Sequence, residues 1–453
     1  MTEQHRSVHL SEGPGSGQPV FDLSGSGRAW FLLAMGMALH LAAVHLAPKA
    51  GGMPGLWRNV LVVVALPSML ASVVTRLRPR PGLPMPVSLA WLALFAMAGL
   101  GVCWSPYPRA GLETLAYLGA WGCLFVGVRA LQEWRADAAS WLAVWSAGAG
   151  LVAATLQTTV FDNPFGGWLY RFTSFASPQV YGLSLALLVA LLLIGVRRER
   201  LPLVVVAPLA GALVIASQMN GGRQGFLATA LVLLFSAIPI GALGWRRLLP
   251  LPAAVLACAM AFSLLVRAAA PAPMRELLEV NDVIGLLTFS QKSLAESGDA
   301  GTTRDRLKIW AALGSRISAS SPAELAFGHG TASAGLVIAE GDVRYRGYTA
   351  ETMDPNRTAH NEFLRSLFEW GVVGLAAFAA MVLLPIAHAA GRLRHHCQSA
   401  DLVLFAAAGL GIPAYAFLGN TLVASGGPLG TAIVLLVVEI YGDSVGETGG
   451  AAQ

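Results

Sequence analysis

Apolar runs of about twenty residues recur along this chain from Ala29 to Tyr441, and they constrain the fold more than any other feature. A helix needs a run of this length to cross a bilayer. Inside hydrocarbon the backbone must satisfy its own hydrogen bonds, so the runs are expected to be helices. Of the 453 residues 55% are apolar and only 12% are charged, whereas soluble domains are about 25% charged. The sequence therefore predicts an all-α integral membrane protein.

Charged residues and Gly/Pro breaks divide the chain into about twelve predicted spanning helices. Arginines concentrate in every second connector, and by the positive-inside rule those connectors are cytoplasmic. Both termini are then cytoplasmic as well, and the long segment before the tenth helix lies outside. The predicted spans are residues 29–47, 56–74, 87–104, 112–131, 140–160, 180–196, 201–217, 225–243, 248–266, 366–390, 402–419 and 427–441.

This topology predicts one large outer loop in an otherwise membrane-embedded chain. The net charge of +5 is spread over short connectors, so a nucleic-acid partner is not expected. The predicted organisation is a disordered cytoplasmic tail at 1–27, helices one to nine at 28–266, a periplasmic loop domain at 267–362, helices ten to twelve at 363–443 and a cytoplasmic tail at 444–453.

The outer loop is expected to be helical and to form a cap over the membrane surface. Its clearest element is a helix from Thr303 to Ile317, and a second amphipathic piece runs from Met274 to Leu287. The spacing in the first helix predicts an apolar face made of Leu307, Trp310, Ala311 and Leu313, with Arg304, Asp305 and Lys308 facing elsewhere.

Two groups of cations on the predicted outer side can bind an anion. Arg223 follows a glycine pair in a short turn and opens the next span, where a guanidinium adds to the positive end of a helix. Arg306 lies four residues before Trp310 and so shares its helical face, and Gly328-His329-Gly330 follows as a tight turn. The plainer alternatives are an arginine reaching toward lipid headgroups for Arg223 and a solvated helix face for Arg306.

A histidine lies where the outer loop re-enters the membrane. His360 is followed by Asn361 and, nine residues later, by Gly371-Val372-Val373-Gly374. An imidazole can take up a proton near neutral pH, as a base acting on a hydroxyl must. The alternatives are a bystander loop histidine, or a role shared with Glu362.

These three stretches resemble the O-antigen ligase and polymerase superfamily. The string HN-x9-GVVG is similar to that family's H[NSQ]x9GxxG signature, SQMNGGRQGF is similar to its arginine turn, and RLKIW followed by LAFGHG resembles its outer loop. The arginine turn departs from the family pattern, because a glycine stands where a serine hydroxyl would lie beside Arg223. Backbone amides are the expected substitute.

The resemblance implies a GT-C-like glycosyltransferase of the bacterial inner membrane with its active site facing the periplasm. The donor would be a glycan on undecaprenyl diphosphate and the acceptor a sugar hydroxyl of lipid A-core. His360 would be the catalytic base, and Arg223 and Arg306 would bind the diphosphate. Donor or acceptor contacts are expected from Asn361, Arg171, Arg267, Arg304 and Arg346.

A metal-independent, inverting reaction without a cofactor is expected. The first outer loop, residues 45–55, contains no acidic residue that could hold a divalent cation at the diphosphate. An O-antigen polymerase and a protein O-oligosaccharyltransferase of the same superfamily remain alternatives. A lipid flippase or transporter is the alternative of another class, but it predicts ionisable residues deep within spans, and few are present.

Overall fold

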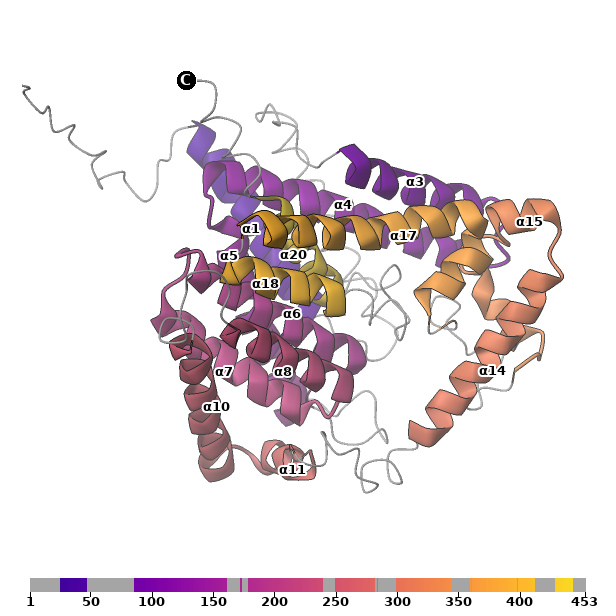
Figure 1. Cartoon of the computed structure of the whole chain (residues 1–453). Helices are drawn as coiled ribbons and strands as arrows, with labels where there is room; N and C mark the ends of the chain where they lie inside the picture. Colours follow the sequence, from indigo (N-terminus) through magenta and orange to yellow (C-terminus); the bar gives the residue numbers. More distant parts are fainter. Residues whose placement is uncertain are drawn as a thin grey trace, which may run out of the picture.

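The structure, a computed structural model, describes residues 25–46, 85–160, 172, 178–238, 249–281, 283, 299–343, 359, 361–396, 398–411 and 428–442. Every regular element within these ranges is a helix, as Figure 1 shows. The elements are α1 (Gly25–Leu46), α3 (Met85–Val102), α4 (Pro108–Trp134), α5 (Ala138–Thr159), α6 (Pro178–Arg197), α7 (Leu203–Met219), α8 (Arg223–Ala237), α10 (Pro250–Ala269), α11 (Ala272–Val280), α14 (Asp299–Ser318), α15 (Pro322–Phe327), η1 (Ser333–Gly335), α16 (Leu336–Ala339), α17 (Glu362–His396), α18 (Ser399–Ala406), η3 (Ala407–Gly411) and α20 (Pro428–Gly442).

The helices fall where the apolar runs predict them. The predicted span 56–74 and both predicted tails up to residue 24 and from 443 lie outside the described residues. Within the described part, four helices are long and apolar enough to cross a membrane, and further apolar helices are shorter. A helical membrane protein is thus confirmed, whereas the number of spans and the GT-C architecture stay predictions. The four are Pro108–Gln132, Ala138–Thr159, Pro250–Ala269 and Glu362–His395.

The centre of the bundle is α6, whose side chains from Tyr181 to Gly195 are buried on every side. Its sequence explains this position, since a helix that is apolar all round has no face to give to a polar environment. The helices packed around α6 are α5, α7, α8, α18 and α20. The rest of the bundle is arranged around this buried helix.

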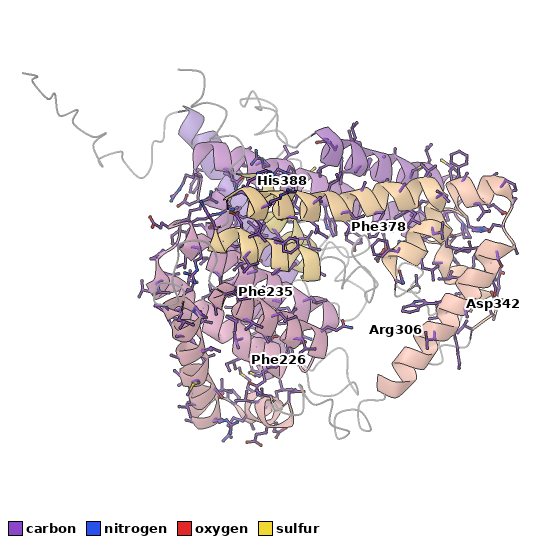
Figure 2. The ribbon with its side chains drawn as sticks, in the orientation of Figure 1. Phe226, Phe235, Arg306, Asp342, Phe378 and His388 are labelled. Atoms are coloured by element: carbon purple, nitrogen blue, oxygen red, sulfur yellow. The ribbon has the colours of Figure 1, made fainter. Side chains whose placement is uncertain are left out.

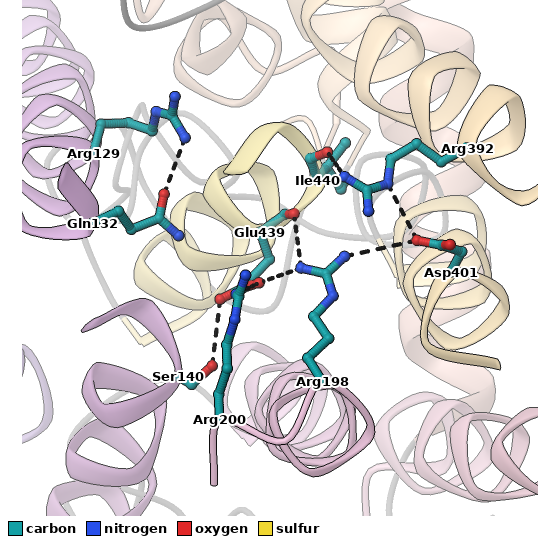
Figure 3. A network of polar contacts seen from close by, with 9 residues as sticks. All are labelled: Arg129, Gln132, Ser140, Arg198, Arg200, Arg392, Asp401, Glu439 and Ile440. Atoms are coloured by element: carbon teal, nitrogen blue, oxygen red, sulfur yellow. Dashed lines mark hydrogen bonds and ion pairs between the residues drawn. The ribbon is translucent and has the colours of Figure 1, made fainter. Parts of the chain in front are cut away.

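A buried ion network joins the helix ends at one side of the bundle (Figure 3). Glu439 of α20 accepts from Arg198 at 2.7 Å and from Arg200 at 2.8 Å. Asp401 of α18 lies 3.7 Å from Arg198 and accepts from Arg392 of α17 at 3.2 Å. The three arginines come from connectors predicted to lie on one side of the membrane, and the structure brings those connectors together.

The opposite end of α17 carries a helical cap. Figure 1 shows α14 and α15 beside the first turns of α17, away from α18. The cap has its own small apolar core, which includes Ile309, Leu313, Val337 and Phe368. The predicted cap helix is confirmed and is longer than expected.

The predicted apolar face of α14 is partly wrong. Leu307 is 57% exposed and Ala311 is exposed too, whereas Ile309 and Leu313 are fully buried. Ile309 and Leu313 are four residues apart, so they form one stripe, and Trp310 lies at its edge. The second amphipathic piece is the shorter α11, and its predicted continuation to Leu287 lies almost wholly outside the described residues.

Candidate functional site

A kink in α17 organises the site. Gly371 has φ 64° and ψ −166°, which breaks the helix at the first residue of the GVVG segment. The carbonyls of Phe368 and Glu369, just before the break, accept from the amides of His329 at 2.9 Å and Gly330 at 3.0 Å. The turn in the cap is therefore bonded to the backbone of the kink.

The turn and the kink approach so closely that glycine is required on both sides. Gly328 has φ 78° and ψ −179°, and a Cβ built there would overlap the backbone of Glu369. A Cβ on Gly371 would overlap the backbone of Ala326 in the same way. Both residues lie in a backbone region that is essentially restricted to glycine. Two motifs more than forty residues apart in sequence thus form one contact.

His329 has a structural role in this contact, as its place between two glycines predicts. Its ring stacks on Phe368 with 4.4 Å between centroids, and its Nε2 shares a hydrogen bond of 2.8 Å with Ser320 Oγ. Burial sets the pKa of His329 below its usual value, although the Glu324 carboxylate, 3.7 Å away, opposes this effect. The imidazole is therefore neutral at neutral pH and serves to pack the turn.

The first turns of α17 hold a buried ion cluster. Arg365, only 1% exposed, lies between Glu362 and Glu369, at 3.6 Å and 3.1 Å respectively. Its guanidinium also reaches Thr114 of α4 at 3.4 Å and lies over the ring of Trp370 at 5.9 Å. A buried charge needs partners of this kind to offset its lost hydration. The sequence reasoning missed the cluster, except for Glu362, although the i, i+3 and i+7 spacing was available.

A second polar link ties the kink to α3. Trp370 Nε1 donates to Thr331 Oγ1 at 2.9 Å, and that hydroxyl donates to the carbonyl of Ala98 at 2.7 Å. All three groups are buried. A Cβ on Gly101 of α3 would press on the Thr331 side chain, so the absence of a side chain there lets the cap turn sit against α3. The kink is therefore held from three directions, by α3, α4 and the cap.

The residues on either side of His360 are anchored, whereas His360 itself lies outside the described residues. The carbonyl of Ala359 accepts from Trp310 Nε1 of α14 at 2.9 Å. Asn361 is buried, and its Oδ1 accepts from the amide of Leu364 at 3.0 Å. That bond caps the N-terminus of α17. Asn361, predicted to touch a substrate, thus has a structural contact here.

Arg306 lies four residues before Trp310, whose indole binds the carbonyl of the residue before His360. It is half-buried, in contrast to the exposed Lys308 on the same helix, as the shared face with Trp310 predicts. Figure 2 shows Arg306 on α14, beside the first turns of α17. Arg304 lies in α14 too, but its side chain is outside the described part. The structure therefore brings Arg306 and the flanks of His360 into one region.

The turn that carries Arg223 is built by close packing of backbone and amide groups. Gly221 has φ 65°, and a Cβ there would overlap the Asn281 side chain. Gln218 donates to the carbonyl of Asn281 at 3.0 Å, and the buried Asn220 donates to the carbonyl of Phe172 at 2.9 Å. Arg223 then begins α8, so its backbone lies at the positive end of that helix.

The remaining predicted residues are not gathered at the kink by the described contacts. The Arg223 side chain, Arg171 and Arg346 lie outside the described part. Arg267 is exposed in the last turn of α10, a helix that packs on α7 and α8. In Figure 2, Phe226, three residues after Arg223, is on a different part of the ribbon from Arg306. The pairing of Arg223 with Arg306 remains a prediction.

Among the described His, Cys, Asp and Glu residues, no group of three or more is placed to hold a metal ion. The acids of the ion cluster are engaged with Arg365 instead. Metal independence stays a prediction.

The comparisons with known proteins bear on the part of the chain that forms this site. A family model described as O-Antigen ligase matches residues 212–379. The match includes the Arg223 turn, α14, the cap turn and the kink of α17. No curated protein matches the sequence at a significant level.

Proposed function

Because the chain belongs, through residues 212–379, to the O-antigen ligase superfamily, we propose that it is an O-antigen ligase. This family comprises glycosyltransferase-like membrane enzymes, ligases and related polymerases, that use lipid-linked glycans. The proposed reaction transfers a polysaccharide from undecaprenyl diphosphate to a sugar hydroxyl of lipid A-core. It takes place at the periplasmic face of the bacterial inner membrane.

One observation carries the proposal. Both sequence neighbours of His360 are held in place, Ala359 by the bond from Trp310 to its carbonyl and Asn361 by its cap of α17. Arg306 lies one helical turn from Trp310 on the same face. A base and a cation held by rigid neighbours are what a transfer from a diphosphate carrier requires.

His360 is proposed as the base that takes the proton of the acceptor hydroxyl as this oxygen attacks the anomeric carbon. Arg223 and Arg306 are proposed to bind the diphosphate, which gathers negative charge as the glycosidic bond breaks. Fixed cations at the membrane surface can lower such a barrier by several kcal/mol, roughly the effect of an oxyanion-hole donor. The reaction then needs no metal ion, and direct attack inverts the anomeric centre.

The acceptor side is assigned to further cations. Lipid A-core is phosphorylated, and guanidinium groups bind phosphates through two parallel hydrogen bonds. Arg171, Arg267, Arg304 and Arg346 are the proposed contacts with donor or acceptor. For Asn361 the structural cap described above reduces its availability, so its proposed contribution is to hold His360 in place.

The test is a lipopolysaccharide gel from a deletion strain that expresses each variant at equal level. His360→Ala, Arg223→Ala and Arg306→Ala should lose the O-antigen ladder, while Lys308→Ala, exposed on the same helix as Arg306, should keep it. Normal ladders from His360→Ala would remove the proposed base. In the deletion strain a ligase leaves polymer on the undecaprenyl carrier, whereas a polymerase leaves single repeats. Single repeats would therefore overturn the ligase in favour of the polymerase.

A further inference from the structure

A cavity of about 500 Å³ lies between α3, α4, α17 and α20, further along the bundle than the ion cluster. Its walls are apolar and aromatic, with no charged side chain among the lining residues. The volume is within the range of small-molecule sites, about 300–1,000 Å³. The described charges of the site, Arg365 and its two carboxylate partners, are not part of it.

Glycines on α4 and aromatic rings on α3 give the cavity its shape. Trp91 and Phe95 of α3 stack at 5.3 Å between centroids. A Cβ on Gly122 would overlap the Trp91 ring, whereas a Cβ on Gly119 would lie 3.6 Å from Phe95, at ordinary contact distance. Gly122 thus lets the indole approach α4, and Gly119 leaves open space in front of the rings.

The cavity is a groove that opens sideways, because two of its lining residues are at the surface. Leu92 of α3 is 52% exposed and Val126 of α4 is 43% exposed. An apolar surface at this depth of a membrane-embedded bundle faces the lipid chains. A hydrocarbon chain can therefore enter between α3 and α4 without passing a polar barrier.

The groove lies further along three of the helices that form or support the candidate site, α3, α4 and α17. On α4 it begins at Gly119, five residues after Thr114, the partner of Arg365. On α17 it begins at Met381, ten residues after the Gly371 kink, which is about 15 Å at 1.5 Å per residue. On α3 the groove lies toward the N-terminus, away from the C-terminal end that contacts Thr331. A ligand with its polar head at the kink would have its tail in this groove.

We propose that the groove binds the isoprenoid chain of the polyprenyl diphosphate donor, an inference that rests on the proposed function. In a bilayer a chain gains nothing by leaving water, so selective binding must come from packing and shape. Flat indole and phenyl faces opposite a glycine fit the planar, methyl-branched isoprene unit. The indole N–H groups of Trp91 and Trp121 are buried without an acceptor among the described residues. They can face the chain's double bonds, which a saturated acyl chain lacks.

The test is photolabelling of the full-length protein in phosphatidylethanolamine and phosphatidylglycerol vesicles. One probe is undecaprenyl diphosphate with a diazirine in an isoprene unit near the head, and the other is phosphatidylethanolamine with a diazirine in an acyl chain. The first probe should label the peptides of α3 and α4, and excess unlabelled undecaprenyl diphosphate should compete. Gly119→Leu should weaken this labelling about ten-fold, as a pocket-filling group does.

Matched variants separate blocking of the groove from damage to the fold. Gly148→Leu of α5 makes the same change where a Cβ meets nothing within 4 Å, and Gly119→Ala adds only one methyl group. Both should label like the wild type. Equal labelling by the two probes, labelling of Gly119→Leu at the wild-type level, or cross-links from the groove to residues 47–84 in place of the probe would overturn the proposal.

Because labelling needs no turnover, the groove and the proposed function can fail separately. A protein that shows competed groove labelling but transfers no glycan keeps the groove and loses the ligase. A protein that transfers glycan with no competed labelling in α3 or α4 keeps the ligase and loses the groove.

Discussion

The contact between the cap turn and the kink of α17 makes a sharp prediction for Gly328→Ala. The backbone there, at φ 78° and ψ −179°, disfavours any residue with a Cβ by about 1–3 kcal/mol. The added methyl group would also overlap the backbone of Glu369 and push the turn away. That displacement breaks the two amide bonds from His329 and Gly330, worth about 0.5–1.5 kcal/mol each. The total loss of stability is about 2–6 kcal/mol.

Gly341→Ala is the matched control. Gly341 also has a positive φ, 81°, but a Cβ there would meet nothing within 4 Å. Its substitution therefore carries backbone strain without the collision or the broken bonds. The comparison isolates the contact from the general effect of alanine at a positive φ.

The measurement is the thermal midpoint of the purified protein, followed by intrinsic fluorescence, together with glycan transfer in vesicles. Gly328→Ala should melt well below Gly341→Ala and lose most transfer activity, because the moved turn no longer fixes the kink. Gly371→Ala should behave alike, since it strains the same contact from the other side. The double variant should be less damaging than the sum of the two, because one displacement relieves both collisions. Equal midpoints for Gly328→Ala and Gly341→Ala would refute the reasoning.

Three further predictions concern other parts of the molecule. Glu439→Gln removes a buried carboxylate that accepts from two arginines, so it should lower the stability by about 3–5 kcal/mol, measured as a lower thermal midpoint. Arg135→Ala, at an exposed ion pair, is the control and should change the stability by less than about 1 kcal/mol. Burial lowers the pKa of His329, so the stabilising effect of the neutral imidazole is complete above the ordinary pKa of 6.5 and is lost as pH falls through the lower folded value. The thermal midpoint of the wild type should therefore drop more than that of His329→Gln when the pH is taken below 6.5. Trp310→Phe removes the hydrogen bond to the Ala359 carbonyl, so the turnover number for transfer should fall while the thermal midpoint changes by the equivalent of about 1 kcal/mol; an unchanged turnover number would separate α14 from the site.

The helix positions could be predicted from the sequence because hydrocarbon leaves the backbone little choice. Apolar length alone located α4, α5 and α10 to within a few residues at most of their ends. The apolar face of α14 was harder to predict from the sequence, because the residues packed against it come from α16 and α17, far away in sequence. The predicted apolar face is therefore wrong for Leu307, whose side chain is exposed.

The ion cluster was missed for a different physical reason. Glu362 was considered only as a possible partner of His360, Arg365 lies one residue before the predicted span 366–390, and Glu369 lies inside that span among apolar neighbours. Charged residues within an apolar helix are expensive unless they pair with each other, so their i, i+3 and i+7 spacing was the available signal. Read that way, the three residues predict a buried network on one face, which is what α17 has.

The two glycine motifs have a structural role that explains their presence before any chemical role is considered. Gly328 and Gly371 each leave room for the backbone of the other's segment, so a residue with a side chain at either position would separate the cap from α17. That separation would also loosen the segment from Asn361 to Trp370, which the cap, α3 and α4 hold together. A sequence signature that pairs a histidine with GxxG therefore selects for the support as well as for the proposed base. It follows that loss of transfer in a glycine variant is weak support for a chemical role. Variants of His360 and Arg306, which do not belong to the two glycine motifs, are the ones that test the chemistry.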